Sequence, residues 1–483
     1  MTEIAGDLTT KAAADTPRRG PTNLQTALLG GLAVLPALAW AWGFTVDDAL
    51  ITARVARHLA NGLGYRFNAG GAVVDAVTPL GFAFLLAPFA RGGVVAGFVA
   101  AKWFGALAWV ASAALLGRAL GRLGVRRRRL LPLLVVAVSL PCAAWAVSGM
   151  ETGLVTLFAT LAVCAAKGDR PLWAGLCAAL RPELTPWALA LGVARPVLER
   201  RAIQQVALGG LSGVAPAVVV ALLRWKIFGH ALPLAFYAKP SDLEHGLRYT
   251  LGGLAFTGLP MLLMAPLELG RVSNRCRGWF AACVAHAVAL ALAGGDWMAL
   301  YRLWVPVLPM MALVGAELCE HATIRACALR VALGLGSAGL LAFGLGLRAR
   351  SVGAERAQLI VEGRSALAFS SRTASEDVGW VGAASDSEVI DLAGVTDPTV
   401  AFFPGGHTSK RIPEHWLRAR DPDAIVLLLA RSERVQEPYW DSLFAREVEQ
   451  SVARSVRERY RVRTTLPFGD QRYLLLERAL DTH

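Results

Sequence analysis

The chain is dominated by long apolar runs that are separated by short charged loops. Three clear examples are Leu24–Trp42, Leu130–Val147 and Val331–Leu347, each close to the ~20 residues that cross a bilayer core. This pattern predicts an α-helical polytopic membrane protein. Read against the Lys and Arg clusters, it gives about eleven spans, near residues 23–44, 94–118, 130–147, 152–166, 171–181, 185–197, 204–223, 247–265, 279–294, 303–318 and 328–347.

A shorter apolar segment, from Pro79 to Ala90, lies between the first two predicted spans. At about 12 residues it is too short to cross a bilayer. Counting it as a span would also move the basic cluster Arg126–Arg129 to the outer side. We therefore predict that it forms a surface helix in a first outer loop over residues 45–92.

The last part of the chain has a different character. It contains four short β-branched or aliphatic runs, with a helical stretch at roughly 439–459. We predict that residues 349–483 form a small α/β domain, which follows an N-terminal segment (1–22) and a transmembrane domain (23–348). The expected strands are Val378–Val381, Glu388–Leu392, Ala424–Leu429 and Tyr473–Leu476.

The charge of the chain divides at the same place. The formal net charge is +13, with a net +15 in residues 1–348 and a net −2 in residues 349–483. The basic residues gather in short loops between apolar runs, which is typical of cytoplasmic loops and argues against nucleic-acid binding. The chain is therefore expected in the cell (inner) membrane, with a cytoplasmic N-terminus and an extracytoplasmic C-terminal domain.

Motifs for metals, nucleotides and disulfides are missing from the sequence. The seven cysteines lie in the apolar part, without CxxC or Cys/His ligand spacing. The sequence contains no P-loop, HExxH, GxSxG or Rossmann fingerprint. No metal ligand and no bound cofactor are predicted, and dependence on a divalent metal and the oligomeric state both stay open.

The sharpest polar feature is the pair Asp47-Asp48, directly after the first predicted span. An ordinary surface helix explains both residues, with Asp47 as its cap and Asp48 in the positive first turn. Two adjacent carboxylates at a membrane surface exceed what capping needs, however. We predict that Asp47 caps the helix and that Asp48 projects towards a substrate as a general base.

Cationic side chains border several of the predicted spans. Arg181 stands beside Pro182 and Glu183 inside an apolar stretch, where ionisable residues are often functional. An internal Arg181–Glu183 pair and an interfacial belt of basic and aromatic residues are the alternatives. The candidate ligands for an anionic group are Arg181, Arg224, Lys226, Lys239 and Arg302.

Other polar residues are candidate substrate contacts. In Gly294-Gly295-Asp296-Trp297-Met298, Asp296 can accept a sugar hydroxyl and Trp297 offers a stacking face, although an Asp296–Arg302 tether is equally consistent. Glu151 can be a helix-start carboxylate, and the loop that carries His407 can be structural. The candidates for substrate binding are Asp296, Trp297, Glu151, Glu183 and His407.

An ordered series of motifs resembles the GT-C membrane glycosyltransferases that use polyprenyl-phosphate donors. Within that family, the chain looks most like terminal β-(1→2) arabinofuranosyltransferases. Residues Asp75-Ala76-Val77-Thr78-Pro79 depart from the pattern, because relatives tend to carry a Glu-Gly-Tyr-Thr-like stretch there. The resemblance is carried by Asp47–Thr52, Asn61-Gly62, Gly64–Asn68, Thr78–Leu80, Ser148–Thr152, Arg181–Glu183, Leu232-Pro233, Tyr237–Lys239, Gly294–Met298 and Asp391–Asp397.

The resemblance implies transfer of a sugar such as arabinofuranose, with inversion, from a polyprenyl-phosphate sugar to an envelope glycan or lipid acceptor on the outer face of the membrane. In this scheme a carboxylate takes the proton of the acceptor hydroxyl, and cations stabilise the leaving phosphate. The alternative is a sugar-lipid transporter or flippase without transferase activity. Transporters tend to contain internal repeats, and none is visible in this sequence.

Overall fold

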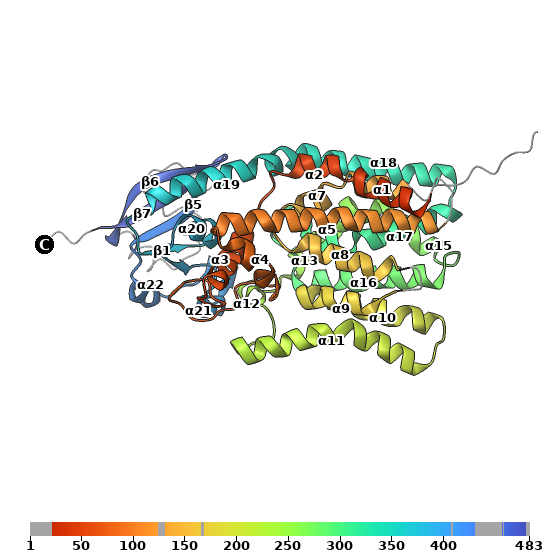
Figure 1. The fold of residues 1–483 in the computed structure, drawn as a ribbon, viewed down its shortest axis with the longest axis horizontal. Coiled ribbons are helices and arrows are strands. Elements are labelled where there is room, and N and C mark those ends of the chain that lie inside the picture. The colour runs from red at the N-terminus through yellow and green to blue at the C-terminus, as the bar shows by residue number, and fades with distance from the viewer. Residues whose placement is uncertain are drawn as a thin grey trace, which may run out of the picture.

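Long helices lie side by side in a bundle, and a small sheet packs at one end of it (Figure 1). The structure is a computed structural model that describes residues 22–123, 131–165, 169–406, 409–429, 456 and 458–479. In the described ranges, seven helical stretches are long and apolar enough to cross a membrane. They are Asn23–Ala41, Val94–Arg122, Ile203–Phe228, Leu243–Glu268, Asn274–Ala293, Arg302–His321 and Ile324–Ala366. These seven stretches confirm the prediction of a polytopic α-helical membrane protein.

The helices of the bundle follow the apolar runs of the sequence. The α-helices of this part are α1 (Asn23–Ala33), α2 (Leu35–Ala41), α3 (Asp48–Ala60), α4 (Phe82–Ala90), α5 (Val94–Arg122), α6 (Leu131–Ala137), α7 (Leu140–Ala146), α8 (Thr152–Val163), α9 (Pro171–Leu180), α10 (Thr185–Leu198), α11 (Ile203–Phe228), α12 (Leu234–Ala238), α13 (Leu243–Gly253), α14 (Leu259–Leu262), α15 (Ala265–Glu268), α16 (Asn274–Ala293), α17 (Leu308–His321), α18 (Ile324–Leu341) and α19 (Leu347–Ala366). Short 3₁₀ turns, η2 (Pro182–Leu184) and η4 (Arg302–Val307), and π-helical turns, η3 (Leu254–Gly258) and η5 (Ala342–Gly346), connect some of them.

Several predicted spans are broken into shorter helices. The run 130–147 divides into α6 and α7 because Ser139 accepts a hydrogen bond from the Cys142 amide, at 3.4 Å, and so starts a new helix. The runs 171–181 and 185–197 are α9 and α10, separated by η2 at Pro182. The segment 79–90 contains the expected helix, α4. The count of about eleven spans stays a prediction.

One helix continues beyond its predicted end. Residues Ile324–Ala366 form a single helical stretch of 43 residues, whereas the apolar run ends near residue 347. Its last part, α19, is rich in Ala, Arg and Glu, which favour helix without requiring an apolar environment. The predicted boundary at 348/349 therefore lies inside a helix, and α19 carries the chain from the bundle to the sheet (Figure 1).

The C-terminal sheet is mixed, with strand order β2-β1-β5-β7-β6. Strand β1 pairs in parallel with β2 and β5, while β7 pairs antiparallel with β5 and β6. The elements are β1 (Arg372–Ser375), α20 (Val378–Ala384), β2 (Glu388–Asp391), α21 (Pro398–Ala401), the small pair β3 (Gly405–Gly406) and β4 (Ser409–Lys410), α22 (Glu414–Arg420), β5 (Ala424–Leu429), β6 (Tyr460–Phe468) and β7 (Gln471–Arg478).

Three of the four strands predicted from the sequence are present, as β2, β5 and part of β7. The fourth is wrong, because Val378–Val381 lies in helix α20. Strands β1 and β6 were not expected. The predicted helix at 439–459 lies almost entirely outside the described residues.

Asp47 explains why residues 378–384 are helical. Its carboxylate accepts hydrogen bonds from the backbone amides of Gly379, at 2.7 Å, and Trp380, at 2.8 Å. These amides belong to the first turn of α20, where a helix has donors without partners. Arg356 of α19 donates to the same carboxylate at 3.0 Å. Asp47 makes no capping hydrogen bond to α3, so the prediction that it caps its own helix is wrong.

Arg54 makes a second connection between α3 and the C-terminal domain. Its buried guanidinium donates to the carbonyl oxygens of Gly382 (2.6 Å), Ser385 (2.8 Å) and Ser387 (2.8 Å). It also donates to the carbonyl of Phe67 at 2.9 Å. Together with Asp47, these bonds fix α3 against the α20–β2 region.

Replacing Arg54 should therefore loosen the C-terminal domain. Arg54→Ala leaves several buried carbonyls without a donor, and we expect it to cost at least about 3 kcal/mol of stability. Arg57→Ala is the matched control, because Arg57 makes an exposed ion pair with Asp386, which typically contributes less than about 1 kcal/mol. Thermal unfolding and limited proteolysis in detergent measure both effects. Equal behaviour of the two variants would contradict the role of Arg54.

The Asp47 contact should also depend on pH. Burial raises the pKa of Asp47 from 3.8 to about 7, and Asp377 and Asp48 add to this rise, while Arg356 opposes it. The raised pKa means that the folded protein binds this proton more tightly than the unfolded chain does, so the bound proton stabilises the fold. This stabilisation is complete below pH 3.8 and is lost as the pH rises to about 7.

The stability of wild type relative to Asp47→Asn should therefore fall between about pH 4 and about pH 7. The measurement is the difference in thermal midpoint between the two proteins across this range. Because groups far from Asp47 are the same in both proteins, the difference reports the titration of Asp47 together with its interaction with Asp377 and Asp48. A difference that stays constant or grows with pH would show that Asp47 is ionised throughout.

Candidate functional site

A polar pocket lies where η2, α12 and the loop between α16 and η4 meet. Its free volume is about 90 Å³. In Figure 1, the short helix α12 lies at the end of the bundle that is nearer the sheet. The lining residues are Thr78, Arg181, Glu183, Ala235, Phe236, Lys239, Ala293, Gly295, Asp296, Arg302 and Leu303. Six of the twelve residues predicted for the site gather in or beside this pocket: Arg181, Glu183, Lys239, Asp296 and Arg302 line it, and Glu151 pairs with Arg181.

The loop after α16 folds back because it begins with two glycines. Gly294 and Gly295 have φ values of 88° and 70°, a backbone conformation that other residues rarely adopt. A Cβ atom at Gly295 would also lie only 2.6 Å from the Tyr249 side chain of α13. The two glycines therefore let the chain pass closely over α13 and turn Asp296 into the pocket.

Arg181 lies between two buried carboxylates. Its guanidinium is 3.1 Å from Glu151 at the start of α8 and 3.0 Å from Glu183 of η2. The helix break at Pro182 brings Glu183 back beside Arg181, so the predicted internal pair is present. Nη2 of Arg181 and Oε2 of Glu151 are nevertheless buried and have no hydrogen-bond partner in the described part of the chain. Buried polar atoms that lack a hydrogen-bond partner suggest that a polar ligand binds here.

Arg302 and Asp296 form the second ion pair of the pocket. Their side chains are 2.9 Å apart, and the Arg302 guanidinium lies over the Trp145 ring at 5.3 Å. Burial opposes ionisation of Asp296, but the nearby cations outweigh it and lower the pKa of Asp296. Asp296 is therefore a carboxylate at neutral pH, and the predicted Asp296–Arg302 tether is present.

Lys239 and Asp48 differ from these pairs. Neither side chain makes a hydrogen bond or ion pair with another residue in the described ranges. Lys239 lines the pocket, close enough to Asp296 for their charges to interact. Asp48, at the first position of α3, is half-buried and lies within electrostatic range of Arg302. The region thus has one cation and one carboxylate that are available to a ligand.

Arg224 and Lys226 lie elsewhere. Arg224 is buried, pairs with Asp75 and donates to the carbonyl oxygen of Thr78. It therefore fixes the segment that brings Thr78 to the pocket, and is not itself a lining residue. Lys226 is exposed on α11. Asp75 and Thr78 were not among the predicted site residues. The sequence signals were that Thr78–Leu80 belongs to the segments that carry the resemblance and that the stretch around it departs from the family pattern.

Trp297, another predicted substrate contact, is not among the residues that line the pocket. Trp297 is 61% exposed and stacks on His245 with ring centres 4.0 Å apart. His407 lies outside the described residues. No group of three His, Cys, Asp or Glu side chains suited to a metal ion occurs in the ranges that the structure describes.

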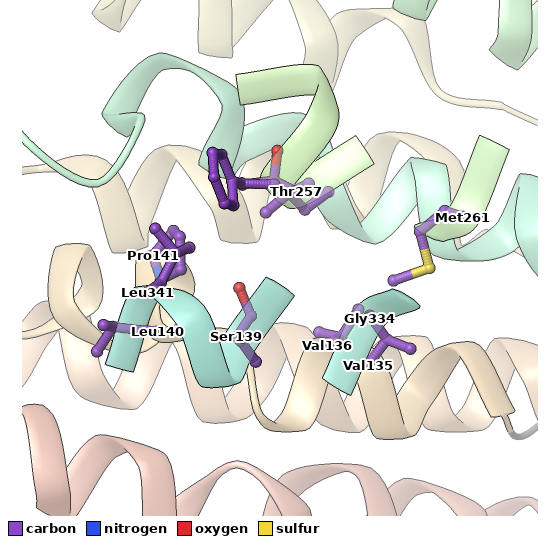
Figure 2. Close-up of a pocket in the computed structure, with 12 residues that line it drawn as sticks. Val135, Val136, Ser139, Leu140, Pro141, Thr257, Met261, Gly334 and Leu341 are labelled. Carbon is purple, nitrogen blue, oxygen red and sulfur yellow. The ribbon is translucent and has the colours of Figure 1, made fainter. Parts of the chain in front are cut away.

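Figure 2 shows a different cavity, between α6, the start of α7, α18 and η3. Its free volume is only about 20 Å³, enough for about one water molecule. The lining is mostly aliphatic, and the hydroxyl of Thr257 donates to its own helix, at the carbonyl of Gly253 (2.5 Å). The hydroxyls of Ser139 and Thr257 both bond to the backbone, and the cavity carries no charged lining residue.

Comparison with known proteins concerns only the C-terminal domain. A family model described as a domain of unknown function (DUF8728) matches residues 361–476. No curated protein and no solved structure matches the chain. The matched residues run from the end of α19 into β7, so they include the sheet and leave out the helical bundle and the lining of the polar pocket.

Proposed function

We propose that the protein is a membrane glycosyltransferase that uses a polyprenyl-phosphate sugar as donor. In this proposal the helical bundle has the GT-C architecture, and the acceptor is an envelope glycan or lipid. The observation that carries the proposal is the composition of the polar pocket, where Arg181, Arg302 and Lys239 stand beside buried carboxylates at the end of an apolar bundle. Lys239 is the lining cation that makes no ion pair in the described ranges, and a lipid phosphate would supply an anion for it at the membrane.

Some charged residues of this region are already in ion pairs and others are available to a ligand, and this difference suggests a role for each. Arg181 and Arg302 are already held in place by carboxylates, and the unpartnered Nη2 of Arg181 can donate to a phosphate without movement of the side chain. Lys239 can form a new ion pair with the phosphate. Asp48 can accept the proton of the acceptor hydroxyl as a general base. The acceptor oxygen then forms a bond to the anomeric carbon as the bond between that carbon and the phosphate oxygen breaks, and the phosphate leaves as an anion stabilised by these cations.

The position of the C-terminal domain supports an acceptor-binding role. It packs on α3, next to the proposed base, through the bonds of Asp47 and Arg54. In the proposed topology this domain, the 45–92 loop and the pocket face the outer side of the inner membrane, and the N-terminus is cytoplasmic. Arabinofuranose is the proposed donor sugar, on the resemblance alone.

The central test is removal of the proposed base. Asp48→Asn keeps the size of the side chain but removes its basicity, which typically costs about 10²–10⁴ in rate. We expect this variant to fold, to bind the polyprenyl-phosphate sugar and to lose transfer in detergent. Asp47→Asn is the matched control, since Asp47 is occupied by α20 and Arg356, and it should show a loss of stability with smaller loss of turnover.

Two results would count against this assignment. A stable but inactive Asp47→Asn, together with an active Asp48→Asn, would give the base role to the other carboxylate. Lipid-linked sugar that crosses proteoliposome membranes in the absence of any transfer would instead favour the transporter or flippase.

The donor phosphate can be tested through Lys239. Lys239→Ala removes a charge-assisted contact that typically contributes roughly 1.5–3 kcal/mol, so KM for the donor should rise by about tenfold or more. Lys226→Ala changes the same residue type on the exposed face of α11 and should leave KM unchanged. Initial rates over a range of donor concentrations distinguish the two. An unchanged KM in a folded Lys239→Ala protein would exclude Lys239 from the phosphate site.

A further inference from the structure

A second polar cavity, of about 540 Å³, shares no lining residue with the proposed active site. It lies where the C-terminal part of α3, the start of α5, the end of α19 and the α20–β2 loop meet. This volume is within the range of pockets that hold small ligands. The proposed reaction makes no use of it.

The charge of this cavity is positive. Arg57 and Arg364 line it, with Asp386 as the acidic residue of the lining. Arg57 and Asp386 pair with each other at 2.5 Å and neutralise their charges. Arg364, in the last turn of α19, is exposed and makes no hydrogen bond or ion pair with any described residue. It therefore provides an unbalanced positive charge at the mouth of the cavity.

Backbone groups add to this preference for an anion. Helix α5 begins at the cavity, and no side chain caps its first turn. The amides there point outwards with the positive end of the helix dipole. Gly93, with φ of 119°, makes the turn into the helix and leaves these amides uncovered by a side chain.

An apolar stripe leads from the cavity along α5, which is long and apolar enough to span a membrane. Val95, which lines the cavity, is followed at intervals of four residues by Val99, Trp103 and Leu107, and all four are exposed. Residues four apart lie on one face of a helix. The stripe therefore extends from the polar cavity into the predicted hydrocarbon region of the bilayer.

We propose that this cavity binds the phosphate headgroup of an anionic phospholipid, with one acyl chain along the α5 stripe. The phosphate lies between Arg364 and the start of α5, and Arg57 remains paired with Asp386. A cationic pocket continuous with an exposed apolar stripe matches a molecule with a charged head and an apolar tail. A free phosphate would contact only the polar cavity, and an apolar ligand would contact only the α5 stripe.

The test is lipid binding by the full chain in a phosphate-free detergent, measured by native mass spectrometry. Wild type should bind dioleoylphosphatidylglycerol more tightly than dioleoylglycerol, which has the same chains without the phosphate. Arg364→Ala should weaken phosphatidylglycerol binding by about tenfold, and Arg364→Glu should abolish it. Arg461→Ala is the control, because this arginine is exposed on β6, away from the cavity, and should bind like wild type.

Thermal midpoints of the variants show that they are folded, which is expected because Arg364 is exposed. Equal affinity for phosphatidylglycerol and dioleoylglycerol would overturn the proposal, as would an equal loss in the Arg364 and Arg461 variants. Inorganic phosphate that displaces phosphatidylglycerol at a similar concentration would show a simple anion site and would also overturn it.

Discussion

Charge buried at the end of an apolar bundle must be balanced by neighbouring charge, and this requirement organises the region around the pocket. A single unpaired ion there would cost several kcal/mol, so Arg181 lies between Glu151 and Glu183, and Arg302 lies beside Asp296. These partners come from four different segments of the chain. Arg181 joins η2 to α8, and the Arg302–Asp296 pair fixes the loop before η4; charge interactions between the two sets hold them side by side in the pocket wall.

The same principle explains how the C-terminal domain is attached. Two charged side chains at α3 bind backbone groups of that domain: Asp47, just before the helix, accepts from amides of α20, and Arg54 donates to carbonyls of the α20–β2 region. Such contacts are specific in direction as well as in distance. Asp48, the next residue, is consequently held at a fixed place relative to both the sheet and the bundle.

Features that depend on residues close together along the chain can be predicted from the sequence. Long apolar runs are visible as helices, and the strand Ala424–Leu429 follows from a local aliphatic run. Val378–Val381 looks like a strand by the same criterion, but Asp47, over 300 residues earlier, supplies the acceptor that starts a helix there. Arg224 looks like a free cation until Asp75, 149 positions away, is found beside it. Tertiary partners of this kind leave no pattern in a single sequence.

The continuous helix from Ile324 to Ala366 has a mechanical consequence. At 1.5 Å per residue, its 43 residues extend about 65 Å, roughly twice the thickness of a bilayer core. One continuous helical stretch, with the π-helical turn η5 inside it, thus leads from the predicted membrane region to the sheet. A helix that tilts to match a thinner bilayer swings its far end sideways by several ångströms. Because Asp47 and Arg54 fix the C-terminal domain to α3, such a tilt turns the sheet and the bundle together relative to the membrane plane.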